Sequence, residues 1–92
     1  MWYLYVVRCK DGSFYTGITK DVEARIKVHN SPRGAKYTRA RRPVVLLYTE
    51  EFETKSQALH REIEVKKLGR ENKIHLVKFG AGSRFSLAAG WE

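Results

Sequence analysis

The feature that most constrains the fold is a pair of apolar segments near the start of the chain, Trp2 to Arg8 and Ser13 to Ile18. Both segments are rich in aromatic and β-branched residues, a composition typical of strands, and their short separation predicts an antiparallel hairpin. In the first segment apolar residues occupy both alternating positions, so we expect both faces of that strand to be covered.

Two registers are possible for the hairpin, and a shift of one residue turns each side chain to the opposite face. A two-residue turn at Asp11-Gly12 would place Tyr5 and Tyr15 on opposite faces of the sheet. A three-residue loop closed by Gly12 in the left-handed region would instead pair Tyr5 with Gly17 and put both tyrosines on one face. We favour this second register because it gathers an apolar layer on the other face, formed by Leu4, Val6, Phe14 and Ile18.

Three helices and one further strand are predicted after the hairpin. The first helix runs from Asp21 to His29 and is capped by Thr19 or Asp21, with Val22 and Ile26 as its buried stripe. Arg25 and His29 are spaced i and i+4, so they lie together along one flank of that stripe. The nearly continuous apolar run Val44 to Glu50 predicts a strand covered on both faces.

The second helix is expected over residues 54–68, because Thr54 and Gln57 have the spacing of a capping box. Its apolar stripe consists of Ala58, Leu59, Ile63, Val65 and Leu68. Glu62 falls near the middle of that stripe, where a carboxylate is costly unless a cation meets it. A last short helix is expected over residues 71–79.

The predicted fold class is a small α/β (α+β) domain. It comprises a three-stranded antiparallel sheet flanked by three helices, in the order β-β-α-β-α-α. We expect this domain to cover residues 1–80. Residues 81–92 are rich in small side chains and lack helical periodicity, so we expect a flexible C-terminal tail.

The charge balance favours a polyanionic partner. Eighteen Lys and Arg against ten Asp and Glu give a net charge of +8 on 92 residues, and nucleic acid is the common partner of such a chain. Five of the cations lie between Arg33 and Arg42, around Tyr37. This segment is interpreted either as a loop that binds phosphates and stacks a base, or as an ordinary solvated loop.

Other classes of protein are disfavoured. A lone cysteine, Cys9, cannot form an internal disulfide, and the three histidines are too dispersed for a zinc cage. The first apolar run is too short for a signal sequence or a membrane span. The composition therefore favours a cytoplasmic protein that has no membrane partner.

Tyr3-Leu4-Tyr5 and Tyr15-Thr16-Gly17, followed by Arg25, His29 and Glu62, resemble the ordered motifs of the GIY-YIG nuclease domain. The resemblance covers about residues 2–79 and is closest to small stand-alone bacterial proteins of that type. It departs at Tyr3, where the family has glycine. Taken singly, each of these residues has an ordinary interpretation: the tyrosines as sheet aromatics, Arg25 and His29 as the solvent-exposed flank of a helix, and Glu62 as an ion-pair partner of Lys66. The spacing of all five residues together supports the resemblance.

The resemblance implies a metal-dependent endonuclease that hydrolyses DNA in preference to RNA, with a role in repair or recombination. Its implied catalytic residues are Tyr5, as general base or water-orienting group, and Tyr15, which positions Tyr5 or the phosphate. Arg25 would neutralise charge on the phosphoryl oxygens, His29 would assist proton relay, and Glu62 would hold one Mg²⁺ or Mn²⁺. A phenol acts as a base at neutral pH only if neighbouring cations lower its pKa. The predicted substrate-binding residues are Gly17, Lys36, Arg39, Arg41 and Arg42.

Two alternatives remain open for the function. One is a nucleic-acid-binding module with weak or lost catalysis. The other is a subunit that needs a partner protein to supply specificity, since the sequence contains no helix-turn-helix or zinc motif with which to select a site.

Overall fold

The computed structural model describes residues 1–80, and the predicted tail over residues 81–92 lies outside them. The predicted element order and three-stranded antiparallel sheet are confirmed, with one additional four-residue helix, α2. In chain order the elements are β1 (Trp2–Arg8), β2 (Phe14–Thr19), α1 (Val22–His29), α2 (Lys36–Arg39), β3 (Val45–Phe52), α3 (Lys55–Lys66) and α4 (Arg70–Phe79).

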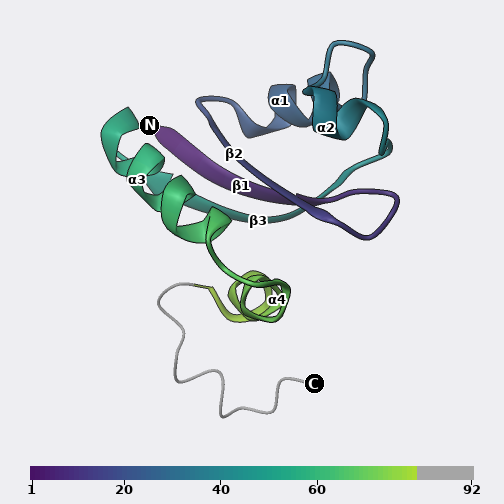
Figure 1. Ribbon diagram of the computed structural model, residues 1–92. Coiled ribbons are helices and arrows are strands. Elements are labelled where there is room, and N and C mark those ends of the chain that lie inside the picture. Colours follow the sequence, from purple (N-terminus) through teal and green to yellow (C-terminus); the bar gives the residue numbers. More distant parts are fainter. Residues whose placement is uncertain (81–92) are drawn as a thin grey trace.

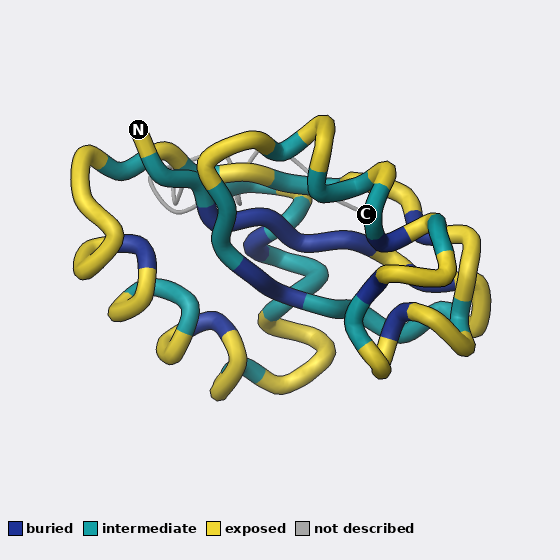
Figure 2. The backbone as a smooth tube through the Cα atoms, turned by 90° about the horizontal axis from the view of Figure 1, so that it is seen from above, coloured by how far each residue is buried: buried dark blue, intermediate teal, exposed yellow. Residues whose placement is uncertain are grey.

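The sheet is built around β1, which lies between β2 and β3 and pairs with both in the antiparallel sense. Its four central residues, Leu4 to Val7, are buried, and in Figure 2 they form the dark stretch at the centre of the molecule. The prediction that both faces of this strand are covered is confirmed.

The hairpin adopts the second predicted register. Tyr5 pairs with Gly17 and Val7 pairs with Tyr15. The N–H of Cys9 donates to the carbonyl of Ser13 at 2.8 Å, and Gly12 has a φ of 86°, a conformation that glycine adopts without steric cost. A three-residue loop therefore sets the faces on which both tyrosines lie.

Each face of the sheet contributes to its own apolar cluster. On one face Leu4 and Val6 pack with Val65 of α3 and Leu76 of α4, joined by the predicted layer residues Phe14 and Ile18. On the other face Tyr5 and Val7 pack with Ile26 of α1. Figure 1 shows this division, with α1 and α2 on one side of the sheet and α3 and α4 on the other.

The predicted helix caps form. The Asp21 carboxylate accepts the N–H of Ala24 at 3.0 Å, which makes Asp21 the N-cap of α1. The capping box of α3 is complete, with Thr54 accepting from the Gln57 N–H and the Gln57 side chain accepting from the Thr54 N–H. These contacts satisfy donors that a helix start leaves unpaired.

Two packing predictions are wrong. β3 is an edge strand, and Val45 and Leu46 are 51% and 40% exposed; a continuous apolar run does not reveal whether a further strand or helix covers it. In α3, Leu59 and Ile63 are exposed, while Ala58 and Val65 are buried. The buried stripe of α3 is therefore rotated toward Glu62, which is half-buried.

Among residues 1–80, no helix is long and apolar enough to cross a membrane.

Candidate active site

The candidate active site is built on the face of the sheet that holds both tyrosines. Tyr5 is only 1% exposed, and its phenol occupies the space left by the missing side chain of Gly17. A Cβ atom at Gly17 would lie 2.5 Å from the Tyr5 Oη and 2.7 Å from its Cζ. The Tyr15 ring lies beside Tyr5, with 6.5 Å between the ring centroids.

His29, the last residue of α1, makes the closest contact with Tyr5. Its Nε2 lies 2.7 Å from the Tyr5 Oη, and its ring meets the edge of Tyr15 at a centroid distance of 5.1 Å. The sequence placed His29 on the flank of α1, but it is the fully buried residue of that helix. The side chain of His29, the last residue of α1, therefore lies inside the site and not at its edge.

The titration of this pair differs from the sequence prediction. Burial raises the pKa of Tyr5, with smaller raising effects from Tyr15 and Glu62, and the Arg25 guanidinium opposes these effects. The required lowering of the pKa by cations is therefore not met, because desolvation disfavours the phenolate more than Arg25 favours it. Burial, followed by the nearby Arg25, lowers the pKa of His29, so the imidazole is neutral at pH 7 and one of its ring nitrogens carries a lone pair.

Arg25 and Glu62 lie on different elements, and both act electrostatically on the phenol. Arg25 is half-buried on α1, and its charge favours the phenolate of Tyr5 and lowers the pKa of His29. Glu62 lies on α3, its side chain is 17% exposed, and one of its oxygens lies 3.2 Å from the Lys66 ammonium. The predicted ion pair with Lys66 is thus present, and it coexists with an electrostatic effect of Glu62 on Tyr5.

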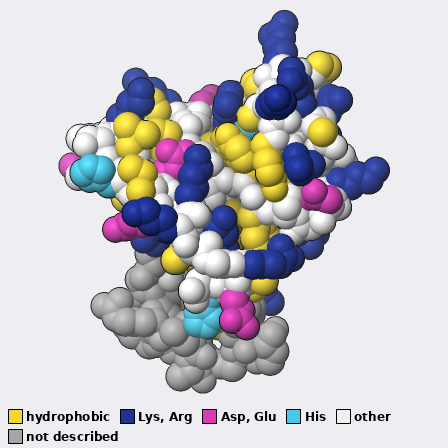
Figure 3. All heavy atoms as spheres, viewed as in Figure 1, with side chains coloured by type: hydrophobic (Ala, Val, Ile, Leu, Met, Phe, Trp, Pro, Cys, Tyr) yellow, Lys and Arg dark blue, Asp and Glu magenta, His cyan; other side chains and the backbone are white. Residues whose placement is uncertain are grey.

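The predicted basic segment forms a hollow beside this face. The prediction of a loop over Arg33 to Arg42 is wrong in part, because the segment contains α2. Figure 3 shows the cations gathered over α1 and α2. The hollow has a volume of about 770 Å³ and is lined by Pro32, Lys36, Tyr37, Arg39, Ala40, Arg41 and Arg42.

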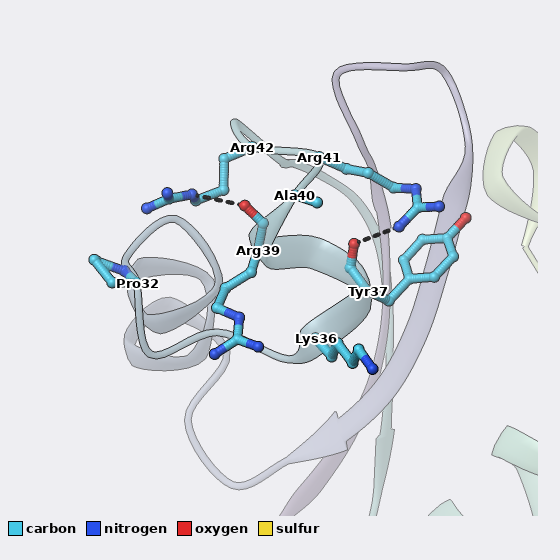
Figure 4. A pocket seen from close by; sticks show the side chains of 7 residues that line it. All are labelled: Pro32, Lys36, Tyr37, Arg39, Ala40, Arg41 and Arg42. Atoms are coloured by element: carbon cyan, nitrogen blue, oxygen red, sulfur yellow. Dashed lines mark hydrogen bonds between the residues drawn. The ribbon is translucent and has the colours of Figure 1, made fainter.

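The four predicted substrate-binding cations fall into two groups. The Arg41 guanidinium binds Asp11 at 3.0 Å and the Tyr37 carbonyl at 2.8 Å, and Arg42 donates to the Arg39 carbonyl. Within residues 1–80, the side chains of Lys36 and Arg39 form no hydrogen bond or ion pair, and in Figure 4 both extend to the same side of α2. These two cations are therefore the ones free to bind phosphates.

Comparison with known proteins agrees with this geometry. The family model of the GIY-YIG catalytic domain matches residues 1–75. The chain belongs to the GIY-YIG family. Membership places it in a family of nuclease domains.

Similar proteins come from several bacteria. The chain is 56% identical to the UPF0213 protein SSP2268 of Staphylococcus saprophyticus over 78 residues, which is 85% of this chain and 95% of that protein. The solution NMR structure of the UPF0213 protein BH0048 from Bacillus halodurans has 49% identity and a TM-score of 0.57, covering 91% of this chain and 90% of that one. The structure of EF2693 from E. faecalis has 41% identity and a TM-score of 0.58, covering 98% and 88%.

The donors available for a divalent ion in this GIY-YIG domain are few. No group of three or more His, Cys, Asp or Glu side chains that could hold a metal occurs in residues 1–80. Glu62 nevertheless fits a magnesium-type ion, because its carboxylate is partly accessible and Mg²⁺ keeps several waters while taking oxygens from a phosphate. The residues are compatible with one weakly held ion that shares its ligands with a substrate.

Sequence reasoning missed the contacts of two polar residues, one that contacts His29 and one that follows it in the chain. Thr38 of α2 is fully buried, and its Oγ1 lies 2.7 Å from the Nδ1 of His29. The Asn30 side chain binds both the N–H and the carbonyl of Val44, at 2.7 and 3.2 Å. A four-residue helix has no periodicity to detect, so only the threonine inside a cationic run could have drawn attention to Thr38.

Proposed function

We propose that this GIY-YIG domain is an endonuclease that hydrolyses phosphodiester bonds in DNA with the help of one divalent ion, in repair or recombination. The observation that supports the proposal most directly is the buried Tyr5–His29 pair at 2.7 Å. A neutral histidine there gives the phenol a hydrogen-bond acceptor, and the charge of Arg25 acts on both side chains.

Tyr5 is proposed to act as the general base through His29. A water molecule gives a proton to the Tyr5 oxygen while the phenol proton passes to His29 Nε2. The water oxygen then bonds to phosphorus, and the ester bond on the opposite side breaks. The leaving oxygen takes a proton from solvent. His29 then returns its proton to the Tyr5 oxygen, and the phenol passes its own proton to water, which restores the starting state.

The other residues are proposed to bind and orient the phosphate. Arg25 neutralises charge that develops on the phosphoryl oxygens, and Tyr15, whose ring lies beside Tyr5, orients the phosphate. Glu62 would hold the Mg²⁺ or Mn²⁺ ion, which when bound supplies positive charge for the departing oxygen. Lys36 and Arg39 would bind neighbouring phosphates of the strand, with Arg42 beside them.

The basic surface supports contact with the nucleic-acid backbone rather than with bases. Arg41 covers one face of the Tyr37 ring at 3.9 Å from its centroid, and Tyr15 stacks against the same ring at 5.8 Å. Phosphate contacts give affinity without reading sequence. We therefore propose that a partner protein or the shape of the DNA supplies specificity. We also propose that the protein works in the cytoplasm.

A nucleic-acid-binding module with weak catalysis is the second candidate. The ion pair between Glu62 and Lys66 favours it, because Lys66 competes with a metal for the only carboxylate near Tyr5 within the described residues. The raised pKa of Tyr5 also favours the binding module, because it makes the phenolate harder to form.

Cleavage assays on single-stranded, duplex, flapped and Holliday-type DNA separate the two candidates. For the nuclease we expect nicking with Mn²⁺ that EDTA abolishes and that is lost in Glu62→Ala. Glu64→Ala is the matched control, because its carboxylate is 67% exposed and bound to Arg61. Binding of these substrates without cleavage under any of these conditions would support the module.

A further inference from the structure

The Tyr5–His29 hydrogen bond is the first of three in a chain that leads away from the sheet. His29 Nδ1 lies 2.7 Å from Thr38 Oγ1, and the Thr38 hydroxyl donates to the carbonyl of Ala35 at 3.1 Å. His29 and Thr38 are both fully buried. Because no solvent reaches either side chain, each must find its hydrogen-bond partners within the protein.

Counting the hydrogens assigns the proton of the imidazole. A hydroxyl has one proton to donate, and Thr38 gives it to Ala35. The Thr38 oxygen must then accept from His29, which places the proton on Nδ1 and leaves the lone pair on Nε2. The opposite tautomer would direct an N–H at Tyr5, whose phenol proton has no other acceptor within residues 1–80.

We propose that Thr38 is a positioning residue that fixes the tautomer of His29, so that Nε2 stands ready to receive the phenol proton. The catalytic role of Thr38 rests on the proposed nuclease function. The assignment of the His29 tautomer does not depend on that function. The orientation of a histidine ring is commonly set by the partner of its distal nitrogen.

The short helix that presents Thr38 is held by local contacts and by one contact with the distant hairpin loop. The backbone N–H of Arg41 donates to the Thr38 carbonyl at 3.0 Å. The Arg41 guanidinium binds Asp11 in the hairpin loop and lies over the Tyr37 ring, as Figure 4 shows. The hairpin loop, α2 and the site therefore form one connected unit.

Close backbone contact between α1 and the segment before α2 is also required. A Cβ atom at Gly34 would lie 2.9 Å from both the Cα and the carbonyl oxygen of His29. A glycine at this position lets the chain fold back closely enough for Thr38 to reach the far side of the imidazole. Glycine is the usual solution where two backbones must approach this closely.

Loss of the Thr38 hydroxyl should therefore slow proton transfer without weakening the binding of DNA. In Thr38→Val the shape of the side chain is retained but no oxygen accepts the Nδ1 proton. The imidazole is then free to carry its proton on Nε2, where it blocks transfer from Tyr5. Thr38→Ser keeps the hydroxyl and is the matched control.

NMR of the ¹⁵N-labelled ring of His29 tests the tautomer directly. We expect the proton on Nδ1 in the wild type and in Thr38→Ser, and a shift toward Nε2 in Thr38→Val. A wild-type ring that carries its proton on Nε2 overturns the proposal by itself, even if the valine variant fails to fold. An unchanged tautomer in a folded Thr38→Val protein also overturns it.

Single-turnover cleavage of a DNA substrate gives a second readout. We expect Thr38→Val to lower the cleavage rate about 100-fold, the lower range for loss of a positioned proton transfer, while DNA affinity stays unchanged. A tautomer that depends on Thr38 in a protein without nuclease activity would leave the positioning role intact and refute the proposed function. Normal cleavage by Thr38→Val with an unchanged tautomer would refute the positioning role alone.

Discussion

Gly17→Ala is the substitution whose effect can be worked out most fully from the structure. The new Cβ atom would lie 2.5 Å from the Tyr5 Oη, so the phenol must move by about 1 Å to restore normal van der Waals contact. It cannot move toward His29, because that contact is already 2.7 Å. The hydrogen bond therefore breaks.

The expected cost combines two effects. Leaving the buried phenol and imidazole unpaired costs about 1–3 kcal/mol, and crowding of a packed site adds about 1–3 kcal/mol. We therefore expect the free energy of unfolding to fall by roughly 2–6 kcal/mol, which lowers the Tm of a domain of this size by at least about 8 °C. Cleavage should fall by about 100-fold as well, since the proton relay is lost.

Urea unfolding and calorimetry of Gly17→Ala measure this cost, with Gly69→Ala as the control. A Cβ atom at Gly69 meets nothing within 4 Å, so the loss there should stay below about 1 kcal/mol. Equal stability of Gly17→Ala and the wild type would refute the close packing of Tyr5 on Gly17.

Three further predictions concern charge. Because the pKa of His29 is lowered, the folded protein resists protonation of this residue. The stabilising contribution of neutral His29 is complete above about pH 6.5 and is lost as the pH falls through the folded pKa, with a slope of up to about 1.4 kcal/mol per pH unit. The free energy of unfolding of His29→Gln, measured across pH 4–8, should lack this slope. Lys36→Ala and Arg39→Ala should each reduce the slope of log affinity against log salt by about 1. Arg41→Ala should leave that slope unchanged but lower the Tm. Fluorescence anisotropy at several salt concentrations measures the slopes, and a change in Arg41→Ala alone would contradict this prediction. Glu62→Gln should abolish the dependence of cleavage on Mn²⁺ concentration, and a retained dependence would exclude Glu62 as the ligand.

The register of the hairpin was predictable because several local signals agree. Gly12 at the end of a three-residue loop, the alternation of Leu4 and Val6 with Tyr5, and Gly17 opposite Tyr5 all favour one pairing, which the structure confirms. The caps at Asp21 and Thr54 were predictable for the same reason, since each depends on residues within one helical turn. Local chemistry was sufficient wherever the partners are near in sequence.

Features that depend on distant contacts were not predictable from the sequence. The pKa of Tyr5 is raised because burial outweighs the opposing effect of Arg25. The exposure of Leu59 and Ile63 depends on where α3 rests against the sheet, and a helical wheel does not contain that information. Thr38 reaches His29 from α2, which the ion pair between Arg41 and Asp11 ties to the hairpin loop.

The most direct test of the central claim, that Tyr5 activates water through His29, compares cleavage and binding of branched DNA by the wild type and Tyr5→Phe with Mn²⁺. We predict cleavage by the wild type, a loss of at least about 100-fold in Tyr5→Phe, and equal DNA affinity for both proteins. Cleavage by Tyr5→Phe at the wild-type rate would contradict this account.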